Sequence, residues 1–467
     1  MADELNHLRA LVAGQRDRMV HELRRLVRIP SVRSDPAPRA PYGADVRRAL
    51  DAALALAADL GFRTYDAEGH AGHAEFGDGP EMVAAIGHLD VVPAGERWQH
   101  DPFGGELEDG AIYGRGAADD KGPTIAALFA AKALMDSGLQ VGRRVRVIFG
   151  CDEESGRFGC LHHYWQVDGQ PRPVAAFTPD ARFPLIYAEK GICDLTFEVR
   201  RREDEGPLRL AWLRGGQRPN MVPDLAVARI EGRREALYLA ACALQSYWDA
   251  NVTIALEPDA IVVKAVGKSA HGSTPQAGDN AVARLARALL TLDLAADADW
   301  LGWLVRVADP SGAGLGLQAV DPVTGPLTAN LGVVDTDGMS IQCTVNVRYP
   351  VDWTLQTVQE RVAQTVRTDT VALVAMMNNP PLHVPLDAEL TRTLLRVYRE
   401  ETGDTASEPA TMGGGTYARA IPNAVAFGAE FPGGADGPAH EPEERFSVDT
   451  LVRAATIYAR ALYELAR

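Results

Sequence analysis

The chain has 467 residues, a formal net charge of −16 and a pI near 5.2. This length is too great for one compact core and predicts two domains. The acidic balance argues against nucleic acid and anionic membrane surfaces as partners, and no apolar run is long enough to span a bilayer.

The N-terminal segment and the cysteines indicate a reducing compartment. Residues 1–14 include acidic side chains and lack the apolar core of a signal peptide, which predicts a cytoplasmic protein. The five cysteines form no C-x-x-C pair. Free, buried thiols are therefore expected.

The first part of the chain is predicted to form an α/β domain. An amphipathic helix ends before Pro30, and Asp45 is placed to cap a second helix. Strands and helices then alternate, which is typical of a mostly parallel sheet flanked by helices. His70 and His73 lie in a polar segment that contains glycine and are expected to be solvated.

From about Glu189 the pattern changes to short strands with few helices. Strands are predicted at 193–200, 252–256, 261–266, 327–334 and 340–348, and helices near 235–248 and 279–292. Asp337-Gly338 is a hairpin turn signal. We expect an inserted α+β lid domain over 189–383, between the two parts of a catalytic domain, 1–188 and 384–467. A last helix, capped by Ser447, completes that domain.

Acidic and histidine side chains follow several predicted strands. The strand at 82–86 leads into His88 and Asp90, which point to the same side because they are two residues apart. Glu153-Glu154 and Asp180 each follow another apolar strand. Strand ends of this kind meet at one edge of an α/β sheet, and clustered carboxylates repel unless cations share the site. For His88 and Asp90 alone, a buried histidine satisfied by a local aspartate is an alternative.

Together, the motifs resemble those of the co-catalytic di-zinc amidohydrolase family, which includes aminoacylase, carnosinase, succinyl-diaminopimelate desuccinylase and bacterial dipeptidases. The shared motifs are GHLDVVP at 87–93, GRGAADDKG at 114–122, CDEESG at 151–156, TPD at 178–180 and AHEPEE at 439–444. Three more are similar to the bacterial dipeptidase V type: NMVPD at 220–224, NVRYPVDW at 346–353 and GGGTYAR at 413–419.

The resemblance implies two divalent metal ions, zinc first, with manganese or cobalt as alternatives. The implied ligands are His88, Asp119 and Asp180 at one metal, and Asp119, Glu154 and His440 at the other. A water shared by the metals would attack the substrate, with Glu153 as general base. Asp90 would orient His88. The resemblance also implies a cis peptide bond between Asp119 and Asp120.

Residues of the predicted lid and of a glycine-rich loop are implied to meet the substrate. His271 would donate a hydrogen bond to the oxyanion of the tetrahedral intermediate. Asn220 and Arg348 match substrate-contacting positions of the lid, although Arg348 could equally form a structural salt bridge. Gly413, Gly414 and Gly415 would bind a carboxylate through backbone N–H groups; a plain loop is the alternative.

These motifs predict a metal-dependent dipeptidase that cuts the amide bond of small unblocked dipeptides. One alternative is a deacylase of N-acyl amino acids or N-succinyl amines on the same scaffold. Another is a non-catalytic binding protein, which is disfavoured because Glu153 and all the ligand positions are present. The long lid predicts a monomer, since in relatives with shorter lids the oxyanion histidine comes from a partner subunit.

Overall fold

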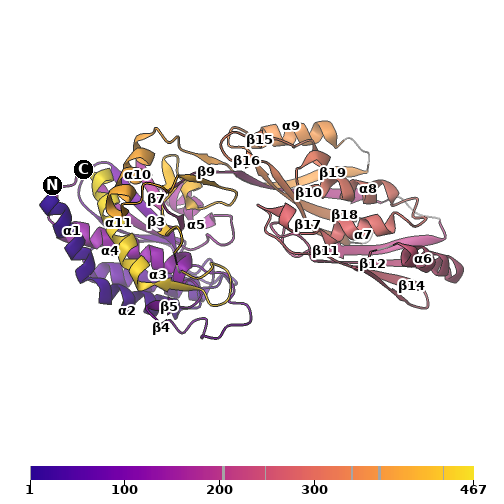
Figure 1. The fold of residues 1–467 in the computed structure, drawn as a ribbon, viewed down its shortest axis with the longest axis horizontal. Coiled ribbons are helices and arrows are strands. Elements are labelled where there is room, and N and C mark those ends of the chain that lie inside the picture. Colours follow the sequence, from indigo (N-terminus) through magenta and orange to yellow (C-terminus); the bar gives the residue numbers. More distant parts are fainter. Residues whose placement is uncertain (1, 202–205, 248, 338–339, 367–369, 435) are drawn as a thin grey trace. The chain divides into compact units, whose positions relative to one another are not determined.

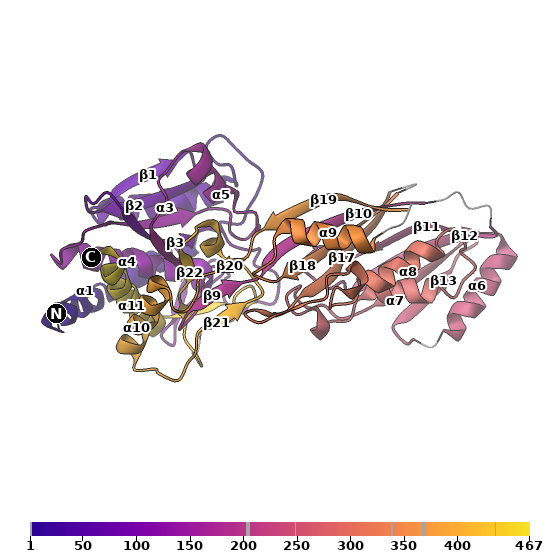
Figure 2. The ribbon, with the colours of Figure 1, turned by 90° about the horizontal axis from the view of Figure 1, so that it is seen from above.

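The structure is a computed structural model that describes residues 2–201, 206–247, 249–337, 340–366, 370–434 and 436–467 (Figures 1 and 2). The chain forms two compact units. Unit 1 comprises the residues up to Ala188 together with Leu382–Arg467, and unit 2 comprises Glu189–Pro381. Each has its own hydrophobic core. Over the described residues, helices that are both long and apolar enough to cross a membrane are absent.

Unit 1 is built on a nine-stranded sheet whose centre is parallel. Strand β3 pairs in parallel with β6 and β7, and β7 pairs in parallel with β22. Antiparallel pairs flank this centre. In sheet order the strands are β1 (Arg63–Ala67), β2 (Ala71–Phe76), β6 (Arg144–Gly150), β3 (Met82–His88), β7 (Ala175–Thr178), β22 (Ala424–Ala426), β9 (Ile186–Glu189) and β20 (Leu382–His383), with β21 (Ala410–Met412) paired to β9.

Helices bury the central strands of this sheet. All seven residues of β3 are buried. Helix α4 (Gly122–Asp136) and helix α11 (Val448–Ala466) pack on each other and against β3 and β6. Helix α4 is apolar on almost every side, as expected of a helix enclosed by other elements. The remaining helices of unit 1 are α1 (Ala2–Gly14), α2 (Arg16–Val27), α3 (Ala44–Asp59), α5 (Gly159–His162) and α10 (Glu389–Thr402).

The helix ends test the predicted caps. Helix α2 ends at Val27, before Pro30, and the Ser447 side chain accepts the Thr450 N–H at the start of α11, so both predictions are confirmed. The prediction for Asp45 is wrong, because α3 already begins at Ala44 and Asp45 lies in its first turn. There its carboxylate still favours the positive end of the helix dipole.

Two further expectations concern the burial of side chains; one was wrong and the other was wrong for one residue. His73 is only 6% exposed rather than solvated, since β2 lies inside the sheet between β1 and β6. Its Nδ1 lies 2.6 Å from the Tyr164 hydroxyl, and burial lowers the pKa of His73 to about 3. The cysteines are all free as expected, but Cys242 is exposed whereas the other four are buried.

Unit 2 is an eight-stranded antiparallel sheet whose buried face is covered by helices. Alternate residues of β10 are buried, which leaves the opposite face of this strand partly exposed. In sheet order the strands are β13 (Val252–Leu256), β14 (Ala260–Val266), β12 (Leu225–Gly232), β11 (Leu208–Gly215), β17 (Thr328–Asp337), β18 (Ser340–Tyr349), β10 (Gly191–Arg200) and β19 (Val371–Asn379). The helices are α6 (Arg234–Ser246), α7 (Ala281–Leu289), α8 (Ala298–Val307) and α9 (Leu355–Thr365).

Unit 2 contains more elements than the sequence pattern predicts. The longer additional elements are β11, β12, β19, α8 and α9. Strands β17 and β18 pair in antiparallel fashion around the predicted hairpin, with Asp337 opposite Ser340. The turn residue Gly338 lies outside the described residues.

Removing the Ser447 cap is expected to destabilise α11 and, with it, the core of unit 1. Ser447→Ala should lower the free energy of unfolding by about 1 kcal/mol, because the Thr450 N–H then loses its acceptor. Urea unfolding of unliganded protein measures this change. Ser447→Thr keeps the hydroxyl and should lose much less; an equal loss in both variants would contradict the capping role.

Candidate metal centre

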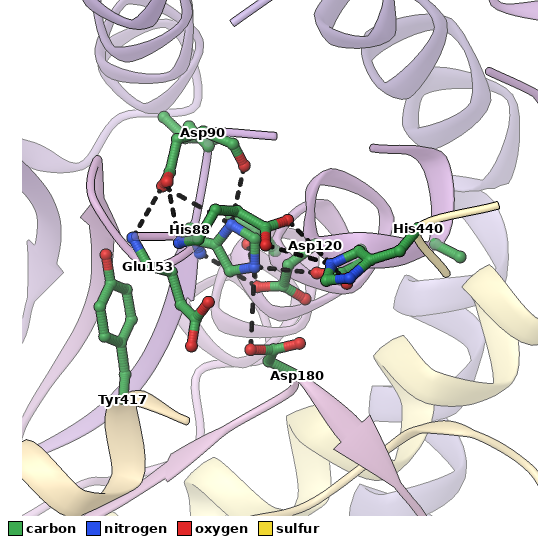
Figure 3. A network of polar contacts seen from close by, with 12 residues as sticks. His88, Asp90, Asp120, Glu153, Asp180, Tyr417 and His440 are labelled. Atoms are coloured by element: carbon green, nitrogen blue, oxygen red, sulfur yellow. Dashed lines mark hydrogen bonds and ion pairs between the residues drawn. The ribbon is translucent and has the colours of Figure 1, made fainter. Parts of the chain in front are cut away.

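The carboxyl ends of three adjacent parallel strands bring the site together. The strands lie in the order β6, β3, β7, and His88 at the end of β3 pairs with Gly150 at the end of β6. Glu153 and Glu154 follow β6, and Asp180 follows β7. The strands therefore bring these residues together at one edge of the sheet, as predicted (Figure 3).

Five side chains form two groups, each of which could hold a metal ion. His88, Asp119 and Asp180 form the first, and Asp119, Glu154 and His440 form the second; within each group the candidate ligand atoms lie within 4.8 Å of one another. Asp119 belongs to both. Its Oδ1 lies 3.0 Å from His88 Nε2, and its Oδ2 lies 3.0 Å from His440 Nε2. One carboxylate therefore lies between the two positions.

The two groups differ in their exposure to solvent. The His88 side chain is 0% exposed, and its Nε2 lies 3.7 Å from Asp180 Oδ2. The His440 side chain is 52% exposed, and its Nε2 lies 3.1 Å from Glu154 Oε2. The first group is thus the less exposed of the two, with a buried histidine and two partly exposed carboxylates, whereas the second opens at His440.

The protonation of His88 is set by its second ring nitrogen. Nδ1 lies 2.9 Å from the backbone carbonyl oxygen of Asp90 and can donate a hydrogen bond to it. Such a bond leaves Nε2 as the ring nitrogen that faces Asp119 and that a metal could bind. The Asp90 carboxylate is farther from Nδ1, at 3.7 Å. It instead accepts the N–H groups of Glu153 and Glu154, both at 3.1 Å, and so holds the acidic turn in place.

Burial governs the charges of the carboxyl groups. It raises the pKa of Glu153 and of Asp180 well above the usual values, because few water dipoles remain to stabilise the carboxylates. Burial acts on Asp119 as well, but hydrogen bonds from His440 and His88 outweigh it and lower the pKa of Asp119. Hydrogen bonds to Asp119 and Glu154 raise the pKa of His440 to about 11.

The donor atoms fit two divalent metal ions. Imidazole nitrogens and carboxylate oxygens suit the first-row transition metals, and a shared carboxylate is a natural bridge between two cations. Two cations would also offset the mutual repulsion of the buried carboxylates. The residues therefore provide both the ligands and the negative charge that such a pair requires.

Asp120 holds the backbone of His88, a residue of the first ligand group, in place. Its Oδ2 accepts the backbone N–H of His88 and the hydroxyl of Thr124, each at 3.0 Å, and burial raises the pKa of Asp120 to about 7. The Asp119–Asp120 peptide bond is cis, as the resemblance implies. The only sequence signal for this support was the adjacent pair of acids before a buried helix.

Glu444 supports the shared ligand, and the sequence analysis did not assign it a role. One oxygen of its fully buried carboxylate accepts the N–H groups of Ala118 and Asp119, at 2.9 and 3.1 Å. The other accepts a hydrogen bond of 2.5 Å from the buried guanidinium of Arg115. Glu444 follows His440 by four residues in the chain. Its hydrogen bond with the Asp119 N–H therefore joins the segment that carries the candidate ligand Asp119 to the segment that carries the candidate ligand His440. Glu444 is the last residue of the AHEPEE motif, which was the sequence signal for this role.

Tyr417 is a second supporting residue that sequence reasoning missed. Its buried hydroxyl accepts the N–H of Asp152 at 3.2 Å and lies 2.9 Å from the sulfur of Cys160. Its ring meets His88 edge-on (Figure 3). A Cβ at Gly150 would come within 2.3 Å of the Tyr417 ring, so this position must be glycine for the tyrosine to reach the turn that carries Glu153.

The predicted glycine-rich loop lies in unit 1, immediately after β21. The guanidinium of Arg419 donates a hydrogen bond of 2.8 Å to the carbonyl oxygen of Gly414. A Cβ at Gly415 would overlap that guanidinium, at 2.1 Å. The glycine-rich loop therefore packs around a buried arginine of the same GGGTYAR motif.

The three predicted lid residues are neighbours within unit 2. The backbone carbonyl of Asn220 accepts the Gly272 N–H, next to His271. The Gly272 carbonyl in turn accepts the hydroxyl of Thr328, whose register partner is Arg348. Arg348 is buried and donates to Asn346 Oδ1 at 2.8 Å. The His271 Nδ1 lies 2.7 Å from the Ser273 hydroxyl.

Comparison with known proteins shows the family of this protein. Residues 84–464 match the model of peptidase family M20/M25/M40. The chain is 35% identical over 465 residues to a Bacillus subtilis (strain 168) protein named "putative dipeptidase YtjP", covering 98% of this chain and 99% of that protein. The chain belongs to this peptidase family.

Solved structures share the fold. Human carnosine dipeptidase 1 matches with a TM-score of 0.56 at 16% identity, covering 99% of each chain. The di-peptidase Dug1p from Saccharomyces cerevisiae matches with a TM-score of 0.58 at 13% identity, covering 100% of this chain and 99% of its own. The predicted α/β fold of this enzyme family is therefore confirmed.

Removing the Glu444 carboxylate is expected to weaken metal binding. Glu444→Ala leaves the Asp119 N–H and the Arg115 guanidinium without their buried acceptor, and should lower metal affinity about 10- to 100-fold. Chelator competition against the purified enzyme measures the affinity. Glu441→Ala changes an exposed acid of the same loop and should leave it unchanged. Wild-type affinity in Glu444→Ala would contradict the supporting role.

Proposed function

We propose that the protein is a metal-dependent dipeptidase acting on the amide bond of small, unblocked dipeptides. The observation that carries the proposal is the two ligand groups joined by Asp119, with the buried carboxyl group of Glu153 beside them and in neither group. The names of the similar Bacillus subtilis protein and of carnosine dipeptidase support dipeptides as the substrate class.

The residues would hold two divalent ions, with zinc as the first choice and manganese or cobalt as alternatives. His88, Asp119 and Asp180 would bind one ion, and Asp119, Glu154 and His440 the other. When bound, such a pair lowers the pKa of a water molecule and polarises the substrate carbonyl.

Glu153 is the proposed general base. Its backbone is fixed by the Asp90 carboxylate, and its side chain lies on the same side of the His88 ring as Asp180 (Figure 3). It would accept the proton of the attacking water and return it to the leaving amine. This role needs a carboxyl group that is close to the ligands without being one of them.

Substrate contacts are also proposed for residues of unit 2 and, separately, for the glycine-rich loop of unit 1. His271 would donate a hydrogen bond to the oxyanion of the tetrahedral intermediate. Asn220 and Arg348 would contact the substrate, Arg348 through a bidentate pair with a carboxylate. Gly413, Gly414 and Gly415 would bind a carboxylate as well. The neighbouring Arg419 guanidinium supports an anion at this loop.

The substrate class and the role of Glu153 are tested together. Metal-loaded enzyme should hydrolyse unblocked dipeptides faster than the matching N-acetyl and N-succinyl compounds. Glu153→Ala should lower kcat by at least about a hundredfold while two metal ions per chain remain bound. Glu154→Ala should lose metal as well as activity, because it removes a ligand.

Three outcomes of this experiment would contradict the proposal. Faster turnover of N-acyl compounds would favour the alternative deacylase on the same scaffold. Retention of most of the kcat by Glu153→Ala would reject Glu153 as the base. Two bound metals with no turnover of any amide would favour a non-catalytic binding protein.

A monomer in which His271 serves its own chain is the proposed working state. Light scattering at assay concentrations should give the mass of one chain. Mixing inactive Glu153→Ala protein with inactive His271→Ala protein should restore no activity, since each chain lacks one required group. Recovered activity would mean that His271 acts across a dimer interface.

A further inference from the structure

A small cavity in unit 1 adjoins the candidate metal centre. Its volume is about 190 Å³, and Asp119 and Asp180 form part of its wall. Cavities that hold a whole drug-sized ligand are larger, from about 300 Å³ upward. This cavity therefore has room for one side chain rather than for an entire substrate.

The rest of the cavity wall is small and mostly apolar. Alanine and proline side chains from four separate segments line it, together with the ring of Phe446. The alanines are Ala118, Ala181, Ala429 and Ala439. Larger side chains at these positions would fill the space, so the volume of the cavity is a direct result of the alanines.

The charge of the cavity is negative. Glu430 and Asp436 join Asp119 and Asp180 in the wall, and lysine and arginine are absent from its described lining. Both oxygens of Asp436 already accept hydrogen bonds of 2.7 Å, from the Ser447 N–H and the Thr450 hydroxyl. Glu430 is exposed, and its carboxylate forms no ion pair with the described residues. Glu430 is therefore the acid available to a ligand.

We infer that this cavity receives the N-terminal residue of the dipeptide and selects a small or medium apolar side chain there. The inference rests on the proposed function. A scissile carbonyl held beside Asp119 and Asp180 has the N-terminal residue on one side and the C-terminal residue on the other. The acids of the wall that bind no metal, Glu430 and Asp436, attract the free ammonium group of the first and repel the carboxylate of the second.

Two specificities follow from this assignment. An apolar side chain gains from leaving water, and in such pockets each methylene changes kcat/KM by about tenfold or more. An acidic side chain is repelled by the wall. The wild-type enzyme should therefore prefer Leu-Ala to Gly-Ala, and should disfavour Asp-Ala. The shared C-terminal alanine keeps the other half of the substrate constant.

Filling the cavity tests its apolar part. Ala181→Leu should lower kcat/KM for Leu-Ala at least about tenfold and change that for Gly-Ala by less than about threefold. Ala439→Leu fills the cavity from another segment and should act in the same way. Ala55→Leu, on the exposed side of α3, is the matched control and should change neither substrate. Metal content and Tm of each variant verify that the fold and the ligands persist.

Neutralising the free acid tests the charged part. Glu430→Gln should raise the kcat/KM ratio of Asp-Ala to Leu-Ala by about two- to fivefold at low salt and by less at high salt, because an exposed charge is screened. Glu408→Gln, at another exposed acid of unit 1, should leave the ratio unchanged.

The outcomes separate this inference from the proposed function. Dipeptide turnover by the wild type, with equal effects of Ala181→Leu and Ala439→Leu on both apolar substrates, would overturn the cavity assignment alone. An unchanged Asp-Ala ratio in Glu430→Gln would overturn the charge argument. Absence of dipeptide turnover in the metal-loaded wild type would overturn the proposed function, and the assignment with it.

Discussion

The shared contact of Asp119 with His88 and His440 is the interaction on which the site depends. Its two oxygens lie 3.0 Å from one imidazole each, so a single carboxylate sets the spacing of two ligand groups. His88 comes from the end of a central strand and His440 from a loop far along the chain. Any shift of Asp119 would therefore change both groups at once.

Several buried contacts hold that carboxylate and its neighbours in place. Glu444 fixes the backbone of Asp119, Asp90 fixes the turn of Glu153 and Glu154, and Tyr417 reaches the same turn from the other side. Each contact uses a charged or polar group inside unit 1, where an unpaired partner would cost more than at the surface. These contacts join the segments that carry the candidate ligands to one another.

The sequence predicts the parts of this arrangement that have a local pattern. Apolar strands followed by acids place His88, Glu153 and Asp180 at one edge of a sheet, because neighbouring parallel strands end together. The resemblance added Asp119 and His440. Glu444 and Arg115 could not be paired in this way, since 329 positions separate them and no local pattern links them.

Unit 2 was predicted less completely, for reasons visible in its strands. The buried positions of β12 are Ala226, Ala228 and Ile230, and alanine gives a weak alternation of hydrophobicity. Strand β19 is an edge strand with Val374 and Met377 exposed, so its apolar residues do not mark one face. The burial of His73 was not predicted, because the polar residues around it do not show the alternation typical of a strand. This strand is paired with a neighbouring strand on each side.

The unequal exposure of the two histidines has a kinetic consequence for an enzyme that depends on two ions. An ion held beside His88 would reach the medium less directly, because its histidine is buried and only its carboxylates are partly exposed, whereas one held beside His440 could exchange directly with the medium. Dilution into chelator should then yield a singly loaded form first. The identity of the ion at the exposed position would then follow the supply in the surroundings faster than that of the ion beside His88.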